Sequence, residues 1–331
     1  MKTHRSQWLV VATAVMLVAL LVSACESTPP TPKPNTLYVN AEQRLGEISS
    51  YIYGTNYGPW ITVPVDLVEA YETSGLRFLR FPGGHWGDLN DIRPAQFDWF
   101  IKLAEMIDAE PSVSVRLLDG TPEEAAALVE YANIEHDYNI RYWSIGNEPS
   151  LYATMDQAEE YDTAYFNTRW RAFAEAMLAV DPDIQLLGPE VHQFTVEPEA
   201  RPKDAQGRDW MREFLLANGD MVDIVTFHRY PFPQNPADAP PTIDDLRRNS
   251  REWDELIPAL RELIAETTDR DLPIGVTEVN SNWSSALGGV GTPDSFYNAI
   301  WWADVLGRLA QQQVEIVAHF ALQSPASFGG W

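Results

Sequence analysis

Short runs of β-branched and aromatic residues alternate with longer amphipathic segments from residue 51 onward. Strict alternation of this kind predicts a parallel sheet covered by helices. Seven of the intervening segments are predicted to be helical. Eight short runs have the length and composition of buried strands, namely Tyr51–Tyr57, Leu76–Phe81, Ser112–Leu118, Ile140–Ile145, Ile184–Leu187, Val222–Phe227, Ile274–Thr277 and Val314–Leu322.

Start signals mark several of the helical segments. Thr121-Pro122-Glu123-Glu124 combines an N-cap, a proline in the first turn and a capping-box glutamate. Thr292-Pro293 is predicted to open another helix in the same way, and Thr154 to cap the longest one. Pro258 predicts either two short helices or one kinked helix within Asp244–Glu266.

Two architectures contain a parallel sheet covered by helices: the closed (β/α)8 TIM barrel and the open doubly wound sheet. The open sheet normally carries a glycine-rich phosphate turn after its first strand, and Gly54-Thr55-Asn56-Tyr57-Gly58 has the wrong spacing for it. We therefore predict an α/β fold with a TIM barrel over residues 51–331. The sequence ends shortly after the eighth strand, so the barrel is expected to be truncated and to lack its last helix; closure by the N-terminal segment is the alternative.

The first 50 residues divide into three segments. Residues 1–24 join a basic start to an apolar run from Trp8 to Val22, which is typical of a signal peptide. Residues 25–35 carry four prolines and predict an extended tether. Residues 36–50 resemble the opening strands of an accessory β-sandwich, so we expect a β segment there.

The only cysteine directly follows the apolar run. Val22-Ser23-Ala24-Cys25 resembles a bacterial lipobox, whose cysteine is lipidated after cleavage. We therefore expect an exported bacterial lipoprotein, held at the cell membrane or envelope through Cys25. An uncleaved signal anchor with an incidental cysteine is the alternative.

The formal net charge of −25 restricts the class of partner. So acidic a surface repels nucleic acid and argues against a basic groove for a polyanionic substrate. The sequence does not determine the oligomeric state.

Two glutamates, Glu148 and Glu278, end the fourth and seventh strand candidates. A carboxylate at the end of a buried strand is costly unless it is solvated, paired or used. The chemistry of a barrel gathers at the C-terminal ends of its strands, so both carboxylates are expected to face one cleft. Such a pair suggests the acid and the nucleophile of a glycosidase.

Longer motifs surround this pair. They are Asn147-Glu148-Pro149, Leu79-Arg80-Phe81-Pro82-Gly83-Gly84 and Phe227-His228-Arg229-Tyr230. Over about Tyr51–Gln323 the sequence resembles the clan A glycoside hydrolases, and the second- and sixth-strand motifs resemble those of the α-L-arabinofuranosidase branch. That branch has an acidic residue in the first turn, which is absent here, and an asparagine where this chain has His85. The β-xylosidase/iduronidase and heparanase-like branches therefore remain open.

The resemblance implies a retaining mechanism that needs no cofactor or metal. Glu278 is expected to be the nucleophile, kept ionised by Arg80 and Tyr230, and Glu148 the acid/base, kept neutral by aromatic neighbours such as Trp143. Asn147 is expected to bond a sugar hydroxyl. The other candidate contacts to a carbohydrate substrate are His85, Trp86, His228, Trp283 and Gln323.

Three further points stay open at this stage. Loop tryptophans such as Trp86 and Trp283 can stack on sugar rings or pack against the protein. Glu190, after the fifth strand, is expected to orient a sugar hydroxyl or a neighbouring side chain. A catalytically idle, glycan-binding barrel or a non-functional fragment is the alternative to an enzyme.

Overall fold

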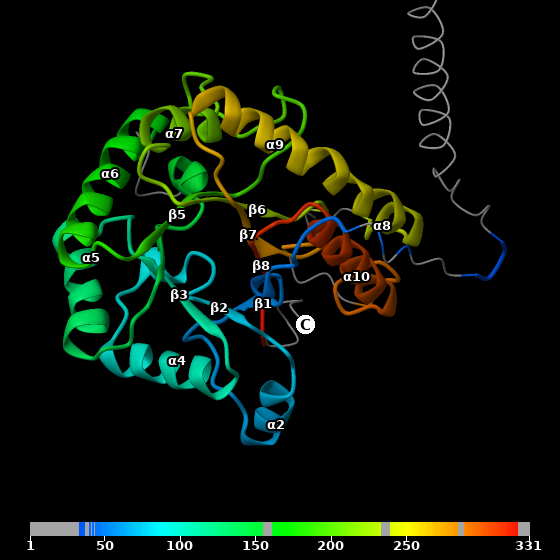
Figure 1. Cartoon of the computed structure of the whole chain (residues 1–331), viewed down its shortest axis with the longest axis horizontal. Coiled ribbons are helices and arrows are strands. Elements are labelled where there is room, and N and C mark those ends of the chain that lie inside the picture. The colour runs from blue at the N-terminus through cyan, green and yellow to red at the C-terminus, as the bar shows by residue number, and fades with distance from the viewer. Residues whose placement is uncertain are drawn as a thin grey trace, which may run out of the picture. The chain divides into compact units, whose positions relative to one another are not determined.

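The computed structural model describes residues 33–36, 40, 42, 44–154, 161–232, 239–283 and 288–323. The chain divides into two compact units, Met1–Leu45 and Gly46–Trp331. The second unit is a closed barrel of eight parallel strands in sequence order, which confirms the predicted TIM barrel and rules out the open doubly wound sheet (Figure 1). The strands are β1 (Gly54–Asn56), β2 (Phe78–Phe81), β3 (Glu110–Val115), β4 (Tyr142–Ile145), β5 (Gln185–Val191), β6 (Ile224–Arg229), β7 (Ile274–Val279) and β8 (Ile316–His319).

Helices surround the strands on the outside of the barrel (Figure 1). Each of the eight predicted strands is present, with boundaries moved by a few residues. The first begins later than predicted, because Ser50–Ile52 forms a 3-10 turn instead. The helices are α2 (Val68–Glu72), α3 (Trp86–Leu89), α4 (Pro94–Met106), α5 (Pro122–Val129), α6 (Thr163–Val180), α7 (Trp210–Asn218), α8 (Ile243–Asn249), α9 (Trp253–Thr267) and α10 (Phe296–Gln311).

The inside of the barrel changes from apolar to polar along the strands. Phe78, Tyr142, Ile224 and Ile316 are the first residues of the four even-numbered strands, and they pack together as one buried cluster. This is the layered filling expected of a barrel interior. Side chains two residues further along a strand point the same way. At that position β2, β4 and β6 carry the buried polar residues Arg80, Ser144 and Thr226, whereas β8 carries Ala318. The polar end is therefore the C-terminal end, where the candidate site lies.

Helix boundaries differ from the predictions at three places. The longest helix, α6, is capped by Asp162 rather than Thr154, and α10 by Ser295 rather than Thr292. The segment around Pro258 does form two helices, but the break lies at Ser250–Glu252, and Pro258 sits inside α9. Pro258 is the sixth residue of α9, beyond the first turn, so its missing N–H removes one i→i−4 backbone hydrogen bond from the helix.

The N-terminal predictions fall mostly outside the described residues. Residues 1–32, with Cys25 and most of the proline-rich segment, lie outside them. Within 36–50, the described residues 36, 40, 42 and 44–50 belong to no strand, so the expected β segment is not seen there. No helix among the described residues combines the length and the apolar composition needed to cross a membrane.

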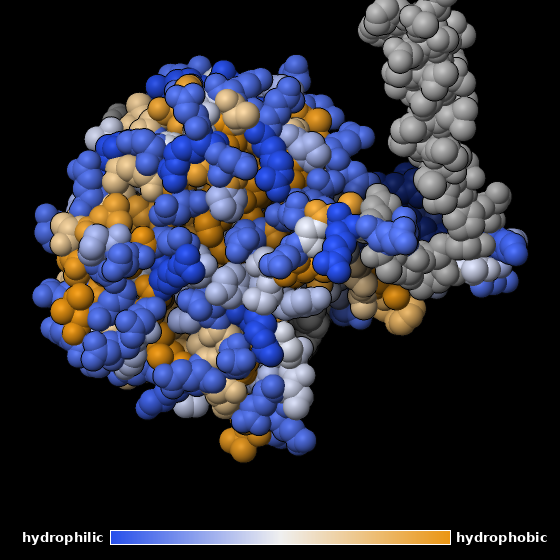
Figure 2. All heavy atoms as spheres, in the orientation of Figure 1, coloured by the Kyte–Doolittle hydropathy of each residue, from blue (hydrophilic) through white to orange (hydrophobic). Residues whose placement is uncertain are grey.

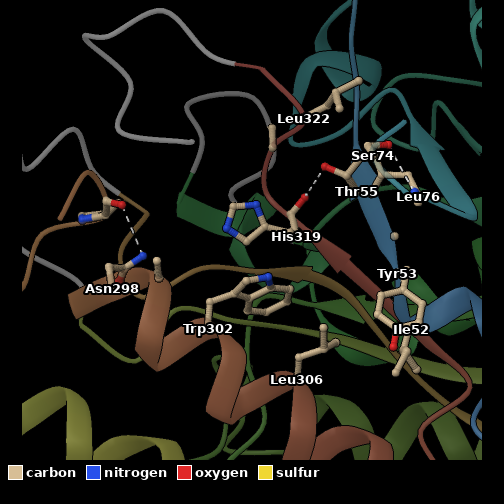
Figure 3. A pocket seen from close by; sticks show the side chains of 15 residues that line it. Ile52, Tyr53, Thr55, Ser74, Leu76, Asn298, Trp302, Leu306, His319 and Leu322 are labelled. Atoms are coloured by element: carbon tan, nitrogen blue, oxygen red, sulfur yellow. Dashed lines mark hydrogen bonds between the residues drawn. The ribbon is translucent and has the colours of Figure 1, made fainter. Parts of the chain in front are cut away.

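A groove of about 390 Å³ runs over the outside of β1 and β8. Trp302 and Leu306 of α10 line one side, and Ile52 and Tyr53 line another (Figure 3). The His319 ring lies 4.9 Å from that of Trp302, centroid to centroid. Residues 320–323, the last that the structure describes, form no helix.

Figure 2 shows hydrophilic residues over most of the visible face, with apolar residues scattered between them. Scattered apolar residues are normal on a soluble surface and need no binding partner.

The N-terminus of α5 offers a direct test of the local sequence signals. Thr121 accepts a hydrogen bond from the Glu124 amide at 3.2 Å, and the Glu124 carboxylate accepts one from the Thr121 amide at 2.9 Å. Thr121→Ala should lower the free energy of unfolding by about 0.5–2 kcal/mol, measured by urea denaturation. Thr168→Ala is the matched control, because Thr168 lies inside α6 and bonds only the Ala164 carbonyl. An equal loss in both variants would contradict the capping role.

Candidate active site

Glu278, on β7, is held by three donors from three different segments. Its Oε1 accepts hydrogen bonds from Arg80 Nη1 at 2.8 Å and from the Gly84 amide at 2.6 Å. Its Oε2 accepts one from the Tyr230 hydroxyl at 2.8 Å. Gly84 has a φ of +59°, which suits glycine and turns its amide toward the carboxylate. These bonds fix the position of the Glu278 carboxylate.

Glu148, directly after β4, lies between two histidines. His228 Nδ1 is 2.9 Å from its Oε1, and His85 Nε2 is 3.1 Å from its Oε2. Burial alone would raise the pKa of Glu148, but the hydrogen bonds from His228 and His85 bring it below its ordinary value. The two histidines therefore favour the ionised form of Glu148.

The expectation that Trp143 keeps Glu148 neutral is wrong. The indole Nε1 of Trp143 donates to the Ile140 carbonyl at 2.8 Å, and the ring belongs to the core between barrel and helices. Successive residues of a strand point to opposite faces, so Trp143 faces away from the barrel interior. Polar neighbours, not aromatic ones, set the protonation of Glu148.

The two predicted glutamates do converge. A carboxylate oxygen of Glu148, a ring nitrogen of His228 and a carboxylate oxygen of Glu278 all lie within 4.8 Å of one another. Three groups at this spacing could also meet around a metal ion. Each of them is already hydrogen-bonded to another side chain of the site, which is the arrangement of a proton-transfer cluster.

Glu190, on β5, is the third carboxylate of the site and is fully buried. Its Oε1 accepts from the Ser144 hydroxyl at 2.5 Å, and its Oε2 lies 2.9 Å from His228 Nε2 and 3.6 Å from Arg80 Nη2. Burial would raise the pKa of Glu190, but Arg80 and His228 lower it to about 2. Glu190 does not reach the Glu148–Glu278 space directly, so it orients neighbouring side chains, which was one of its two expected roles.

The histidines and Arg80 balance the charge of the three carboxylates. Burial would lower the pKa of His228, but Glu278, Glu148 and Glu190 raise it to about 9. Burial alone would lower the pKa of His85 as well. The hydrogen bond and the charge of Glu148 outweigh burial, so the pKa of His85 lies above its ordinary value. Arg80 adds the fixed positive charge.

Two positioning residues were not foreseen from the sequence. Asn56, at the end of β1, accepts from Arg80 Nη1 at 3.0 Å and donates to the Thr277 carbonyl at 2.9 Å. Asp88, in α3, accepts from the Asn147 amide at 2.8 Å and from the Leu117 amide at 3.1 Å. A buried acid or amide that bonds backbone groups leaves no periodic pattern in the sequence. Only its place at the end of a strand or turn could have suggested a role.

Asn147 lies where a sugar-binding amide was predicted. Its Oδ1 accepts from Arg80 Nη2 at 2.9 Å. Its Nδ2 is the remaining donor and has only a 3.5 Å contact with His85 Nδ1. A substrate hydroxyl could therefore bind at Nδ2.

The structure does not bring the remaining predicted contacts into this cluster. Trp283 is 61% exposed, in the loop after β7. The amide oxygen of Gln323 accepts from the Tyr71 hydroxyl rather than from the cluster. Trp86 is half-buried in the first turn of α3, next to His85, and no described contact joins it to the carboxylates. These three residues keep their predicted sugar contacts as predictions only.

Known proteins similar to this chain are carbohydrate-active. No protein-family model matches the sequence. α-L-Arabinofuranosidase C of Emericella nidulans is 28% identical over 198 residues, which cover 46% of this chain and 38% of that protein. Heparanase of Mus musculus is 27% identical over 204 residues, which cover 58% of this chain and 33% of that protein. The matched regions thus span less than two fifths of the length of these curated relatives.

Solved structures show the same fold. A family 51 α-L-arabinofuranosidase from Bifidobacterium longum superposes with a TM-score of 0.66 over 86% of this chain and 69% of that one, at 15% identity. At this identity the likeness speaks for the barrel alone. Together, the barrel and the sequence relatives confirm the predicted resemblance of this chain to the clan A glycoside hydrolases.

Proposed function

We propose that this chain is a glycoside hydrolase that retains anomeric configuration. The observation that carries the proposal is the approach of Glu148 and Glu278, which have carboxylate oxygens within 4.8 Å of each other. Carboxyl groups about 5–5.5 Å apart serve retaining enzymes, whereas inverting enzymes need about 6.5–9.5 Å to admit a water molecule. The spacing here supports double displacement.

In the first step Glu278 attacks the anomeric carbon. A bond forms between its carboxylate oxygen and that carbon, the bond to the leaving oxygen breaks, and Glu148 gives its proton to the leaving oxygen. Arg80 and the Gly84 amide, both on Oε1 of Glu278, hold the carboxylate in place for the attack. Fixed donors of this kind need no reorganisation during the reaction.

In the second step Glu148 takes a proton from water, and the resulting hydroxide displaces Glu278 from the sugar. Arg80 then stabilises the departing carboxylate, because its position does not depend on the sugar. Asn147 Nδ2 donates to a hydroxyl beside the reacting carbon. These steps use groups of this chain, the substrate and water.

For the substrate class we propose O-glycosides of oligo- or polysaccharides, beginning with α-L-arabinofuranosides. Arabinofuranosidases stand first among the sequence relatives. Heparanase is also among them, so glycosides of uronic acids belong in the same panel. A barrel that only binds glycan would have no need of a hydrogen-bonded carboxylate pair.

For location we propose a lipoprotein of the cell membrane or envelope. The proposal rests on the sequence of residues 1–35, because the described structure begins at residue 33. The apolar run supplies an export signal, and Val22-Ser23-Ala24 supplies the small residues before Cys25. The prolines of residues 25–35 would keep the barrel away from the lipid.

Glu278→Ala should lower kcat roughly 10⁴–10⁶-fold, because no covalent intermediate can form. Added azide should restore part of the rate by attacking the anomeric carbon in place of the carboxylate. The readout is aryl-glycoside hydrolysis together with the configuration of the glycosyl azide. Glu110→Ala, at the opposite end of the barrel on β3, is the control and should keep its activity. Normal turnover without Glu278 would remove it as the nucleophile.

Glu148→Ala should slow the reaction in proportion to the need for protonation of the leaving group. Substrates with alkyl leaving groups should lose about 10²–10⁴-fold in the first step, while dinitrophenyl glycosides should lose little. Comparing kcat/KM across a series of leaving groups measures this dependence. A uniform loss across the series would indicate a structural role instead.

Cys25→Ser should abolish lipid modification in a bacterial host. Wild-type protein should partition into detergent, because more than one acyl chain is needed for stable membrane attachment. Mass spectrometry of the N-terminus gives the direct readout. An unmodified Cys25 or a retained Met1 in the wild type would refute the lipoprotein while leaving the hydrolase proposal intact.

A further inference from the structure

Glu190, His228 and Glu148 form a continuous hydrogen-bonded row inside the barrel mouth. His228 Nε2 lies 2.9 Å from Glu190, and Nδ1 lies 2.9 Å from Glu148. We propose that this row is a proton relay, in which Glu190 keeps one proton on His228 Nε2 and thereby leaves Nδ1 to exchange a proton with Glu148. The proposal builds on the acid/base role proposed for Glu148, and it makes Glu190 a positioning residue.

The surroundings of Glu190 allow it to act only as an acceptor. Ser144 and Thr277 both donate hydroxyl hydrogens to it at 2.5 Å, one to each oxygen, and Arg80 Nη2 lies 3.6 Å away. All of these groups are buried. Protonation of Glu190 would turn one of these hydroxyls from donor to acceptor and would remove the charge that pairs with Arg80. The carboxylate therefore stays ionised and requires an N–H from the histidine nitrogen that faces it.

Because Nε2 must present an N–H, a neutral His228 has its lone pair on Nδ1. That lone pair faces Glu148 Oε1 across the 2.9 Å contact. The same logic operates when a carboxylate fixes the tautomer of a catalytic histidine. Here the partner of the histidine is a carboxylic acid rather than a hydroxyl nucleophile.

A single proton, shared between His228 and Glu148, serves both steps of the proposed reaction. Before substrate binds, it sits on Nδ1, so His228 is cationic and Glu148 ionised. When substrate occupies the mouth, the proton crosses from Nδ1 to Oε1 of Glu148 and then to the leaving oxygen. Glu148 later accepts a proton from the attacking water and returns it to Nδ1, so no proton is gained or lost overall.

Other charged groups also face the relay. Glu278 Oε2 lies 3.6 Å from His228 Nδ1 and accepts from the Tyr230 hydroxyl. Arg80 lies between Glu190 and Glu278, and His85 contacts the second oxygen of Glu148. His192 approaches from the end of β5 and contacts Ser150 at 2.8 Å. Once Glu278 is esterified, His228 loses one of its three carboxylates and holds its proton less tightly.

The decisive measurement is the tautomer of His228, read by ¹⁵N NMR of protein labelled at histidine. Protonated and unprotonated ring nitrogens have distinct resonances, and the His228→Gln spectrum identifies the signals to assign. As pH rises, we expect the wild type to lose the proton from Nδ1 and keep it on Nε2. A neutral form protonated on Nδ1 would overturn the proposal.

Glu190→Gln removes the negative charge with little change in shape. The pKa read at His228 should fall by about one to three pH units, because an opposite charge in contact is lost. Glu190→Asp, which keeps the charge, should restore most of the wild-type value. Thr277→Val is the matched control, since it removes a hydrogen bond to Glu190 but no charge, and it should shift the titration much less. An unshifted titration in Glu190→Gln would contradict the role of Glu190.

Kinetics gives an independent readout that separates the relay from the proposed function. Hydrolysis needs the shared proton, so the alkaline limb of kcat/KM should move to lower pH by the same amount in Glu190→Gln. If turnover depends on Glu148 but the alkaline limb does not move in Glu190→Gln, the relay is contradicted and the proposed function is not. If no glycoside reacts, the proposed function is contradicted. The tautomer of His228 then still tests the relay. If Glu190→Gln does not fold by circular dichroism, the wild-type tautomer remains decisive.

Discussion

The ion pairs of Arg80 with Glu190 and Glu278 are the interaction on which the rest of the site depends. Three carboxylates share one buried space, with Glu148 9% exposed, Glu278 3% and Glu190 fully buried. A buried ion left without a partner costs several kcal/mol. Arg80 pairs with Glu190 and Glu278. His85 and His228 pair with Glu148. Because these groups come from β2, β4, β5, β6 and β7, they can meet only inside a closed barrel.

Two local backbone features aim the carboxylates inward. Glu148 and Glu190 both have positive φ, at +49° and +57°, in the left-handed region that costs a non-glycine residue roughly 1–2 kcal/mol. The ladder between β5 and β6 also shifts register between Pro189 and Val191, and such bulges re-aim a side chain. The Glu148 amide donates to the Glu190 carbonyl at 3.0 Å, which joins the two strained turns. Strain of this kind persists only where the surrounding contacts over-determine it.

The sequence predicts the barrel and the convergence of Glu148 and Glu278 because both follow from short-range patterns. Strand composition marks all eight strands, and a carboxylate at a strand end is visible without knowing its neighbours. The partners of Glu148 were not predictable in this way. Whether His85 and His228 or an aromatic ring faces Glu148 depends on loop paths and on register, neither of which has a local signature.

Helix starts show the same division between local and long-range information. Thr154 and Asp162 are both good capping residues by type. Asp162 becomes the N-cap of α6 because contacts from far along the chain hold it there. Asp204 accepts hydrogen bonds from the amide and the hydroxyl of Thr163. Arg208 forms ion pairs with both Asp204 and Asp162. Likewise, the Thr292 hydroxyl is engaged with the Gly289 carbonyl and Asp294, which leaves Ser295 to cap α10. Capping chemistry restricts the candidates, and tertiary contacts select among them.

Before substrate binds, the proposed acid, Glu148, is in the wrong protonation state for catalysis. Glu148 is ionised between two histidines, whereas the first step needs it protonated. The proton need not come from solvent, since it lies one hydrogen bond away on His228. A sugar that fills the mouth displaces water from Glu148, and burial then favours its neutral form. Substrate binding thus supplies the driving force for proton transfer, so the acid forms only when a leaving group is present to receive the proton.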